Sequence, residues 1–486
     1  MSQPAVLERV DMLCAELAQQ LPGEYAHSAA KIRERVHGPL NIALAGRVKA
    51  GKSTLLNALI GERLAPTDAG ESTRIVTWYR FDTGYAVTAR WQDGRHSSPA
   101  FRRGDSALEV DLEREVSALE IGWPSQHLRN TTYIDTPGLG SLTPSVSAAT
   151  SGLLGLEQGS RSEADAVIYL MRHAHAEDVQ FLEGFRDAGL PLGSPVNTIA
   201  VLSRADEIAG GRLDAMSSAA RIAERYQTDP RVRSLAGTVV PVAGLLAETA
   251  ATFEEAEYGA LRLLADSPRF EPGILLSVDR FRDPERNPLT AELRERLLAR
   301  LGLFGLRYCM QLLREGSAPT SQALVSELLS ASGIARLRTT ITQRLTNRAR
   351  PLIARSALAE LWGLSVRISE KFPSAASQLA VAIEEVTASA HEFAQLDLLH
   401  DVATGSAGFT ESEAREAELL AAGGSIAARL AAPIESSRPA LEGAVVAAVE
   451  RWRQRGANPL VSRETARACD VMARSYERLY AELKAG

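Results

Sequence analysis

The stretch that most constrains the fold is a glycine-rich loop between an apolar run and a helix. Residues 40–45, Leu-Asn-Ile-Ala-Leu-Ala, predict a buried strand, and residues 54–60 predict a helix. The loop between them matches the pattern GxxxxGK[ST]. A strand, this loop and a helix in that order predict a phosphate-binding loop, and they disfavour the alternative of a chance glycine-rich turn. The binding segment comprises Gly46, Arg47, Val48, Lys49, Ala50, Gly51, Lys52, Ser53 and Thr54.

The residue types of this loop suit a nucleoside triphosphate. Glycines let the backbone curl so that successive N–H groups point at phosphate oxygens, and a helix N-terminus adds positive potential. We expect Lys52 to reach the β and γ phosphates and the Ser53 hydroxyl to ligate Mg²⁺. The loop therefore predicts a nucleotide site with Mg²⁺ as its cofactor.

A second motif, Asp-Thr-Pro-Gly, follows the apolar run that begins at Thr131. Asp135, at the carboxyl end of a neighbouring strand, can hold Mg²⁺ through water. The Gly138 N–H can hydrogen-bond the γ-phosphate and so sense its loss. The distance of this motif from the phosphate loop strengthens the nucleotide interpretation.

A polar segment, residues 61–74, lies between these two motifs. A threonine just before the next strand is placed to give oxygen ligands to Mg²⁺ and contacts to the γ-phosphate. We choose Thr73 for this role. Ser72 and Thr67 are rivals, and an ordinary threonine at a strand start is the alternative.

Residues 203–206, Ser-Arg-Ala-Asp, follow another apolar run and are candidates for recognising the base of the nucleotide. A carboxylate at Asp206 can accept both the N1–H and the exocyclic amine of guanine, whereas adenine offers no such donor pair. Arg204 can lay its stem and guanidinium plane along the base. Asp206 as a helix N-cap is the alternative, which the two earlier motifs disfavour. Ala243, after the apolar run 238–242, is a candidate backbone donor to guanine O6.

The chain divides into a mixed region and a helical region. Between residues 40 and 242, short apolar runs alternate with longer helical stretches, which predicts an α/β fold with a mostly parallel, doubly wound sheet. Residues 4–37 predict a single amphipathic helix that Gly38-Pro39 ends. Residues 245–350 are mainly helical, and residues 351–486 almost entirely so. The predicted strands are 40–45, 75–79, 86–89, 132–134, 166–170, 198–202 and 238–242.

Composition excludes several classes of protein. Hydrophobic residues make up 45% and charged residues 23%, as in ordinary globular proteins. A net charge of −6 and an aromatic content of 5% disfavour nucleic-acid binding. The three cysteines form no CxxC pair, which fits a reducing compartment and excludes a zinc ribbon. His173 and His175 have no third partner nearby and are interpreted as loop residues rather than metal ligands.

The N-terminus and the apolar runs predict the compartment. Acidic residues interrupt the first 17 residues, so we expect no signal peptide. No apolar stretch reaches the roughly 18 residues that a transmembrane helix needs. We therefore expect a cytoplasmic protein whose membrane contact, if it has one, is peripheral.

In this order the motifs indicate a GTPase, and with the leading helix and the long helical extension the chain resembles the bacterial dynamin-like proteins. It looks most similar to their actinobacterial isoniazid-inducible group, over residues 38–250 above all. The segments that carry the resemblance are IALAGRVKAGKSTLLNAL, APTDAGESTRIVTW, IDTPGLGSL, VLSRADEIAGGRLDAM and VVPVAGLLA.

The resemblance implies a P-loop GTPase domain over residues 38–350 and an elongated helical bundle (neck and stalk) over residues 351–486. It also implies that the helix in residues 1–37 packs into this bundle. The implied activity is hydrolysis of GTP to GDP and phosphate, coupled to peripheral membrane remodelling at the inner face of the plasma membrane. Self-association through the GTPase heads, or pairing with a paralogous dynamin-like subunit, would drive this membrane remodelling. The alternatives are a GTP-controlled switch or assembly partner without its own lipid contact, and a scaffold with a structural nucleotide site.

Three departures from the dynamin pattern concern catalysis. Dynamins usually carry Ser at the place of Lys49, where it helps to hold a catalytic monovalent cation, and often Gln at the place of Val48. We hypothesise that the Lys49 ammonium replaces that cation, with a solvated loop charge as the alternative. No Gln follows the Asp-Thr-Pro-Gly motif to orient the attacking water, so we expect slow basal turnover that self-assembly accelerates.

The helical region alternates in charge. Residues 336–371 are basic, residues 372–450 are mainly acidic, and residues 451–455 are basic again. Antiparallel packing would let opposite charges face each other, which we favour over a lipid-binding patch. The turns at 371–373 and 408–410 carry one aromatic residue each. Trp362, Leu364 and Val366 are expected in the bundle core.

Overall fold

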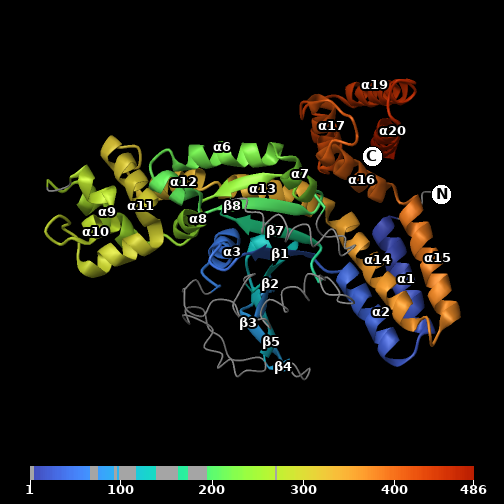
Figure 1. Ribbon diagram of the computed structural model, residues 1–486, viewed down its shortest axis with the longest axis horizontal. Coiled ribbons are helices and arrows are strands. Elements are labelled where there is room, and N and C mark those ends of the chain that lie inside the picture. The colour runs from blue at the N-terminus through green and yellow to red at the C-terminus, as the bar shows by residue number, and fades with distance from the viewer. Residues whose placement is uncertain are drawn as a thin grey trace.

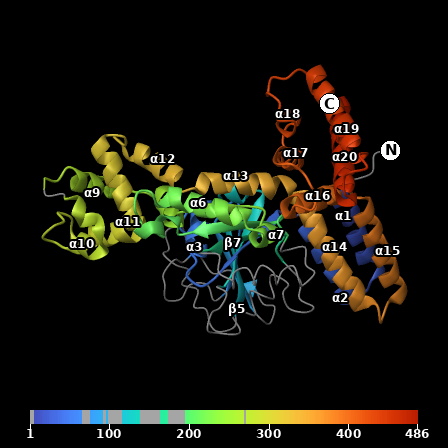
Figure 2. The same ribbon diagram turned by 45° about the horizontal axis from the view of Figure 1, so that its top comes forward.

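The computed structural model describes residues 5–65, 75–91, 96–97, 116–137, 163–172, 194–268 and 271–485. Within them, a central sheet lies between a lateral helical lobe and two helical bundles (Figure 1). The lobe and the bundles lie on opposite sides of the sheet in a second view as well (Figure 2). No described helix has an 18-residue stretch apolar enough to cross a membrane.

The sheet has nine described strands in the order β4-β3-β5-β2-β6-β1-β7-β8-β9. Strands β6, β1, β7, β8 and β9 run parallel to one another, and β2 runs parallel to β5 but antiparallel to β6. The predicted mostly parallel sheet is therefore confirmed. The strands are β1 (Leu40–Gly46), β2 (Val76–Phe81), β3 (Ala86–Trp91), β4 (His96–Ser97), β5 (Val116–Trp123), β6 (Thr131–Asp135), β7 (Ala166–Met171), β8 (Thr198–Ser203) and β9 (Val239–Val242).

The register brings the ends of three strands to one edge. Leu44 of β1 is opposite Asp135 of β6, and Gly46 of β1 is opposite Leu170 of β7. All residues of β6, β7, β8 and β9 are buried, because helices cover both faces of the sheet. The carboxyl ends of these strands consequently form a single rim around the loop that follows β1.

Helices on both faces hold this rim in place. Helix α3 (Lys52–Ile60) packs against β1, β6 and α8 (Gly244–Ala251). Helices α6 (Ala215–Thr228) and α13 (Ile334–Arg344) pack against β9, and α13 also contacts α3. Other helices near the sheet are η1 (Gln126–Leu128), η2 (Ala205–Gly210) and α7 (Pro230–Leu235).

The lateral lobe follows α8 in the chain and has its own apolar core. Buried side chains of α9 and α11 meet those of α8 and α12, so the lobe is continuous with the helix that follows β9. It consists of α9 (Glu255–Ala265), η3 (Pro272–Leu276), α10 (Val278–Arg282), α11 (Ala291–Glu315) and α12 (Ser321–Ala331).

The first bundle joins the N-terminal segment to two later helices. Helices α1 (Val6–Gln20) and α2 (Gly23–Val36) pack against α14 (Ala349–Ile368), and α1 also packs against α15 (Pro373–Ser389). The predicted single helix over residues 4–37 is wrong. Leu21 and Pro22 are extended, because the proline ring disfavours helical backbone at the residue before it.

The second bundle continues from α15. It consists of α16 (His391–Thr404), α17 (Glu411–Ala421), α18 (Ile426–Arg429), α19 (Arg438–Gly456) and α20 (Arg463–Ala485), and η4 (Thr346–Arg348) lies between α13 and α14. The predicted pairing of opposite charges is confirmed. The N–O distances are 2.7 Å for Arg344–Glu418, 2.7 Å for Arg355–Asp397, 2.5 Å for Arg453–Glu477 and 3.0 Å for Arg455–Glu413.

The prediction of the bundle core is only partly right. Leu364 is fully buried, but Trp362 and Val366 are 47% and 60% exposed. They lie four residues apart on α14 and therefore on one face of the helix, a face that is partly exposed to solvent. Both turn aromatics pack internally, Phe372 against Tyr25 and Phe409 against Trp452, with ring centroids 5.9 and 4.8 Å apart.

Candidate functional site

The predicted phosphate loop joins β1 to α3 at the carboxyl rim of the sheet. Gly46 has a φ of +151°, and a Cβ at this position would lie 2.6 Å from the carbonyl oxygen of Leu170 on β7. Gly51 has a φ of +92° and is the N-cap of α3. The close approach at Gly46 and the left-handed backbone at Gly51 explain why the loop needs glycine at these two positions.

Lys49 lies at the outer side of this loop. Its side chain is exposed and its φ of 64° is in the left-handed region, which residues other than glycine rarely adopt. Val48 beside it is 48% exposed. The backbone of the loop thus presents Lys49 outward at the turn between the strand and the helix.

The first turn of α3 and the end of β6 bring a lysine, a hydroxyl and a carboxylate together. Lys52 is 6% exposed, and its Nζ donates to the Gly46 carbonyl over a long 3.4 Å. Ser53 Oγ donates to Asp135 Oδ2 at 3.0 Å. Thr136 Oγ1 donates to the Leu44 carbonyl at 2.7 Å, which fixes the backbone directly after Asp135.

Burial disfavours the charged forms of both Asp135 and Lys52. Asp135 is 1% exposed, and burial raises the pKa of its carboxyl to about 6, although Lys52 and Ser53 act in the opposite direction. Burial also lowers the pKa of Lys52. Within the described residues, the buried Asp135 Oδ1 has no hydrogen-bond partner. A buried carboxylate with an unused oxygen next to a hydroxyl is a donor set that fits a hydrated Mg²⁺.

Several predicted residues lie outside the described part of the chain. These are Thr73 with its rivals Ser72 and Thr67, Gly138, and the two histidines His173 and His175. Among the described residues, no cluster of three or more His, Cys, Asp or Glu side chains could hold a metal ion on its own.

A pocket of about 130 Å³ connects the phosphate loop with the loops after β8 and β9. The structure therefore brings the predicted phosphate and base residues to one cavity, although they are separated by some 150 positions in sequence. The pocket is lined by Ala50, Gly51, Thr54, Leu55, Leu170, Val201, Ser203, Arg204, Asp206, Glu207, Val242, Gly244 and Leu245.

Asp206 lies in this pocket with 7% of its surface exposed. Burial raises the pKa of its carboxyl to about 6, and the neighbouring Glu207 raises it further, while its own backbone N–H and Arg204 lower it. The alternative role as a helix N-cap does not hold. Arg204 is the N-cap of η2, with a left-handed φ of 52°, and Asp206 follows inside the first turn.

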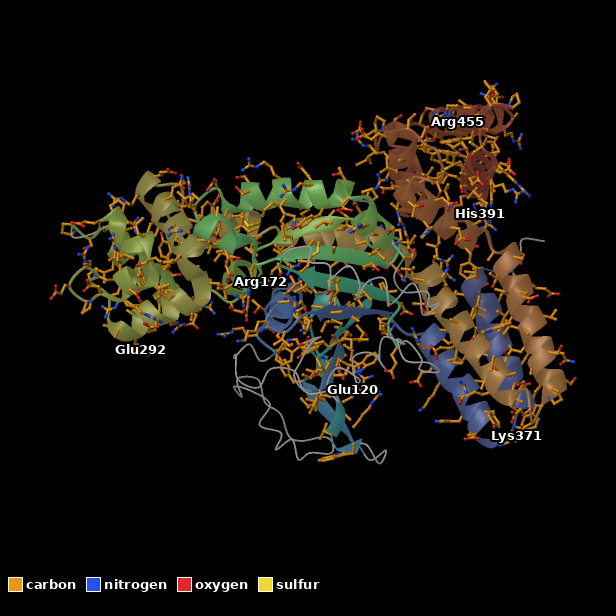
Figure 3. The ribbon with its side chains drawn as sticks, viewed as in Figure 1. Glu120, Arg172, Glu292, Lys371, His391 and Arg455 are labelled. Atoms are coloured by element: carbon orange, nitrogen blue, oxygen red, sulfur yellow. The ribbon has the colours of Figure 1, made fainter. Side chains whose placement is uncertain are left out.

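Arg204 is oriented by a neighbour that the motif did not reveal. Its Nη1 lies 2.7 Å from Glu207 Oε1, and the other carboxylate oxygen lies 2.6 Å from Arg172 Nη2. Arg172 follows directly after β7 and is labelled in Figure 3. Glu207 thus holds two guanidinium groups at the mouth of the pocket. The sequence offered no signal for this contact, because it joins two loops that are 35 residues apart.

The predicted role of Ala243 needs correction. Its N–H donates to the Ser332 carbonyl at 2.9 Å, and the residue is fully buried. The pocket is lined instead by the next two residues, Gly244 and Leu245, in the first turn of α8. The amides of a first helical turn have no partners within the helix, so this turn still presents backbone donors to the pocket.

The chain is similar to several known proteins. The model of the Dynamin family matches residues 42–204. The isoniazid-induced protein IniC of Mycobacterium tuberculosis is 40% identical over 494 residues, which cover 99% of this chain and 95% of IniC. The bacterial dynamin-like protein of Nostoc punctiforme is 28% identical over 28% of this chain and 20% of its own length. The match to a solved oligomerised bacterial dynamin pair covers 99% of this chain and 74% of the other chain, with 15% sequence identity and a TM-score of 0.34.

Proposed function

This chain belongs to the dynamin family, and from that premise we propose that it is a Mg²⁺-dependent GTPase that hydrolyses GTP to GDP and phosphate. The observation that carries the proposal is the single cavity in which the phosphate loop meets Asp206. The lysine, hydroxyl and carboxylate of Lys52, Ser53 and Asp135 lie at the start of the same helix and the end of the adjacent strand. This cavity, together with these three groups at the adjoining start of α3 and end of β6, suits a guanine nucleotide and its metal ion.

Each group has a role in this proposal. The loop amides and Lys52 bind the phosphates. Ser53 and Thr73 ligate Mg²⁺, and Asp135 holds it through water, with its unused Oδ1 as a further acceptor. Bound Mg²⁺ would neutralise charge on the β and γ phosphates. Gly138 senses the γ-phosphate.

The base is recognised from the other end of the pocket. The Asp206 carboxylate accepts the two guanine N–H donors, and the Arg204 guanidinium, oriented by Glu207, lies along the base. We propose that the first amides of α8, at Gly244 and Leu245, take the role of donor to guanine O6 that the sequence placed at Ala243.

Calorimetry with GTP and ATP tests this function. We expect GTP to bind at least about 100-fold more tightly than ATP, because adenine would leave the buried Asp206 carboxylate unpaired. Turnover should be lost in Lys52→Ala, which keeps the fold but removes the phosphate-binding ammonium. Equal affinity for ATP and GTP, or unchanged turnover in Lys52→Ala, would contradict the proposal.

We propose further that hydrolysis is coupled to self-association through the GTPase heads, or to pairing with a paralogous dynamin-like subunit. The protein would act in the cytoplasm and bind peripherally at the inner face of the plasma membrane. Family membership supports this step. The second candidate is a GTP-controlled switch or assembly partner with no lipid contact of its own. The inward packing of Phe372 and Phe409 favours it, because neither turn presents a free aromatic side chain.

The hydrolysis rate as a function of protein concentration, with and without anionic liposomes, separates these candidates. A rate that rises more steeply than in proportion to concentration indicates activation by self-association. A further rise with liposomes indicates membrane coupling. A rate per molecule that stays constant under all these conditions would contradict both forms of coupling.

A further inference from the structure

Asn57 is the one polar side chain in the middle of the apolar sequence Leu55-Leu56-Asn57-Ala58-Leu59 of α3. It is 1% exposed, yet all of its hydrogen-bonding capacity is used. Nδ2 donates to the Ala65 carbonyl at 3.0 Å and to Glu248 Oε1 at 2.9 Å. Oδ1 accepts from the Leu64 and Ala65 N–H groups at 2.9 and 2.7 Å. Asn57 therefore joins α3 both to α8 and to the segment that follows α3.

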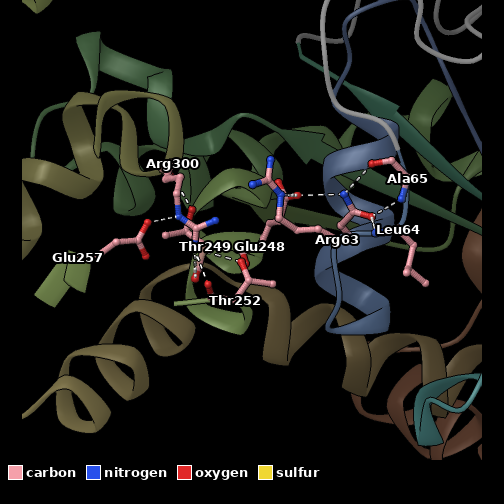
Figure 4. Close-up of polar contacts among 9 residues, drawn as sticks. Arg63, Leu64, Ala65, Glu248, Thr249, Thr252, Glu257 and Arg300 are labelled. Atoms are coloured by element: carbon pink, nitrogen blue, oxygen red, sulfur yellow. Dashed lines mark hydrogen bonds and ion pairs between the residues drawn. The ribbon is translucent and has the colours of Figure 1, made fainter. Parts of the chain in front are cut away.

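Glu248, the partner on α8, is 4% exposed and also contacts Arg63, with 3.3 Å between Arg63 Nε and Glu248 Oε1. Figure 4 shows Glu248 between the segment Arg63 to Ala65 and the residues that anchor the end of α8. There, Arg300 Nη2 donates to the Thr252 carbonyl at 2.7 Å. The end of α8 is therefore tied to α11, and Glu248 is presented to Asn57 from a helix that is fixed at its far end.

The two helices that this contact joins each begin at the nucleotide pocket. Helix α3 starts with Lys52 and Ser53, and α8 starts with Gly244 and Leu245. Ala50, Gly51 and Thr54 line one side of the pocket, and Gly244 and Leu245 line another. The distance between the phosphate half and the base half of the pocket consequently depends on how α3 and α8 are held together.

We propose that Asn57 and Glu248 are positioning residues for GTP hydrolysis, which together set the spacing between the two halves of the nucleotide pocket. The bonds from Asn57 to Leu64 and Ala65 add a second role. They hold the beginning of the polar segment in which Thr73 follows eight residues later. The inference rests on the proposed function, because it assigns these residues to the positioning of GTP.

The bond to α8 should affect nucleotide affinity, and the bonds to the segment after α3 should affect turnover. The variant Asn57→Asp and the double variant Asn57→Asp/Glu248→Gln separate these two effects. Asn57→Asp keeps the acceptor for Leu64 and Ala65 but loses both donors and faces Glu248 with a second carboxylate. We expect about tenfold weaker GDP binding from the lost hydrogen bond to the Glu248 carboxylate, and up to about tenfold lower kcat from the lost hydrogen bond to the Ala65 carbonyl.

In Asn57→Asp/Glu248→Gln the glutamine amide donates to the new carboxylate, so the bond between α3 and α8 is restored with its direction reversed. The donor to the Ala65 carbonyl is still missing. We therefore expect GDP affinity to return to within about twofold of wild type while kcat stays low. A purely structural role would not separate affinity from turnover in this way.

Glu248→Ala decides the question without relying on Asn57→Asp to fold. It removes the bond from Asn57 to α8 together with the contact to the half-exposed Arg63, and it leaves the bonds of Asn57 to residues 64 and 65. GDP affinity should therefore fall about tenfold while kcat at saturating GTP stays near wild type. Glu292→Gln is the matched control, because Glu292 is an exposed carboxylate on α11 at the surface of the lobe (Figure 3).

The inference is overturned if folded Glu248→Ala binds GDP as wild type does, or if the double variant remains as weak for GDP as Asn57→Asp. A lower melting temperature with unchanged GDP affinity also overturns it, because that result assigns a structural role alone. Wild-type protein that binds neither GDP nor GTP would contradict the proposed function instead, so the two failures are distinguishable.

Discussion

Asp135 is a single carboxyl group whose burial should make the stability of the nucleotide-free protein depend on pH. Its pKa is raised from 3.8 to about 6, so the folded state holds the proton more tightly than the unfolded chain. The resulting stabilisation is complete below pH 3.8 and is lost as the pH rises through about 6. We expect the melting temperature to fall between pH 5 and pH 7 and this slope to be smaller in Asp135→Asn.

Differential scanning fluorimetry in the absence of nucleotide and Mg²⁺ measures this slope. Asp206 titrates in the same range with the same sign, so Asp135→Asn should remove only part of it. A slope identical to that of wild type would show that Asp135 does not titrate there.

Asp206 should make recognition of the base depend on pH. Only the ionised carboxylate accepts both guanine donors, and burial raises the pKa of this group to about 6. Inosine diphosphate lacks the exocyclic amine, so comparing it with GDP cancels the titration of the phosphates. We expect the ratio of GDP to IDP affinity to fall toward one as the pH drops from 7.5 to 5. In Asp206→Asn the ratio of GDP to IDP affinity should be close to one at every pH.

Lys49 is the residue at which the phosphate loop departs from the dynamin pattern in a way that bears on catalysis. Its exposed, left-handed position leaves the ammonium free to turn toward the phosphates of a bound nucleotide. If it replaces a monovalent cation, hydrolysis should proceed equally in sodium and potassium, and Lys49→Ala should lose at least about tenfold in kcat with GTP affinity retained. Lys31→Ala, at an exposed lysine of α2, is the control. Dependence on potassium in wild type would contradict this role.

At the scale of elements, α14 offers a direct comparison between its two faces. Leu361 is fully buried, whereas Trp362 beside it is 47% exposed. Leu361→Ala should lower the free energy of unfolding by about 2–5 kcal/mol, because it leaves a cavity in the core. Trp362→Ala removes a larger side chain but only half of its surface is buried, so we expect a smaller loss. Urea denaturation measures both, and a larger loss for Trp362→Ala would place that side chain in the core after all.

The elements that could be predicted from sequence are those whose burial in the fold is already visible in the pattern of neighbouring residues. Strands β1, β7 and β8 are buried on both faces, so they are continuous apolar runs. Strand β5 was missed because its sequence, Val-Ser-Ala-Leu-Glu-Ile-Gly-Trp, mixes apolar residues with Ser117, Glu120 and Gly122. The break at Leu21 and Pro22 was missed because apolar spacing continues across it.

The candidate site divides in the same way. Residues proposed to bind nucleotide through a local motif, such as Lys52 and Asp206, can be found from spacing alone, because each motif is contiguous with its flanking elements. Asn57, Glu248 and Glu207 act through partners that are distant in sequence. The pairing of the Ala243 amide with Ser332 depends on the approach of α12 and α13 to β9, which no motif near Ala243 encodes.

At the scale of the whole molecule, three parts meet at Arg35. This residue of α2 lies with Nη2 2.6 Å from Asp165 Oδ1 and also pairs with Glu360 of α14. Asp165 precedes β7, and its other oxygen accepts from the Asn41 N–H of β1 at 3.0 Å. The ion pairs therefore connect the N-terminal helices and the first bundle to the strand that leads into the phosphate loop.

Removal of Arg35 should thus weaken the joint between the bundle and the sheet. In Arg35→Met the carboxylates of Asp165 and Glu360 stay buried without the arginine, so we expect a loss of about 3 kcal/mol or more in the free energy of unfolding at pH 8. Urea denaturation of the variant and of the wild type at this pH measures the difference.

Arg33→Met is the matched control for this joint. Arg33 lies on the same helix but is 47% exposed, and its partner Asp11 belongs to α1 in the same hairpin. A solvent-exposed pair of this kind contributes little to stability, and its removal should leave the contact between bundle and sheet intact. Equal losses for Arg33→Met and Arg35→Met would show that the buried pairs do not connect the parts. A large loss confined to Arg35→Met would identify them as the contact through which the bundle is attached to the strand of the phosphate loop.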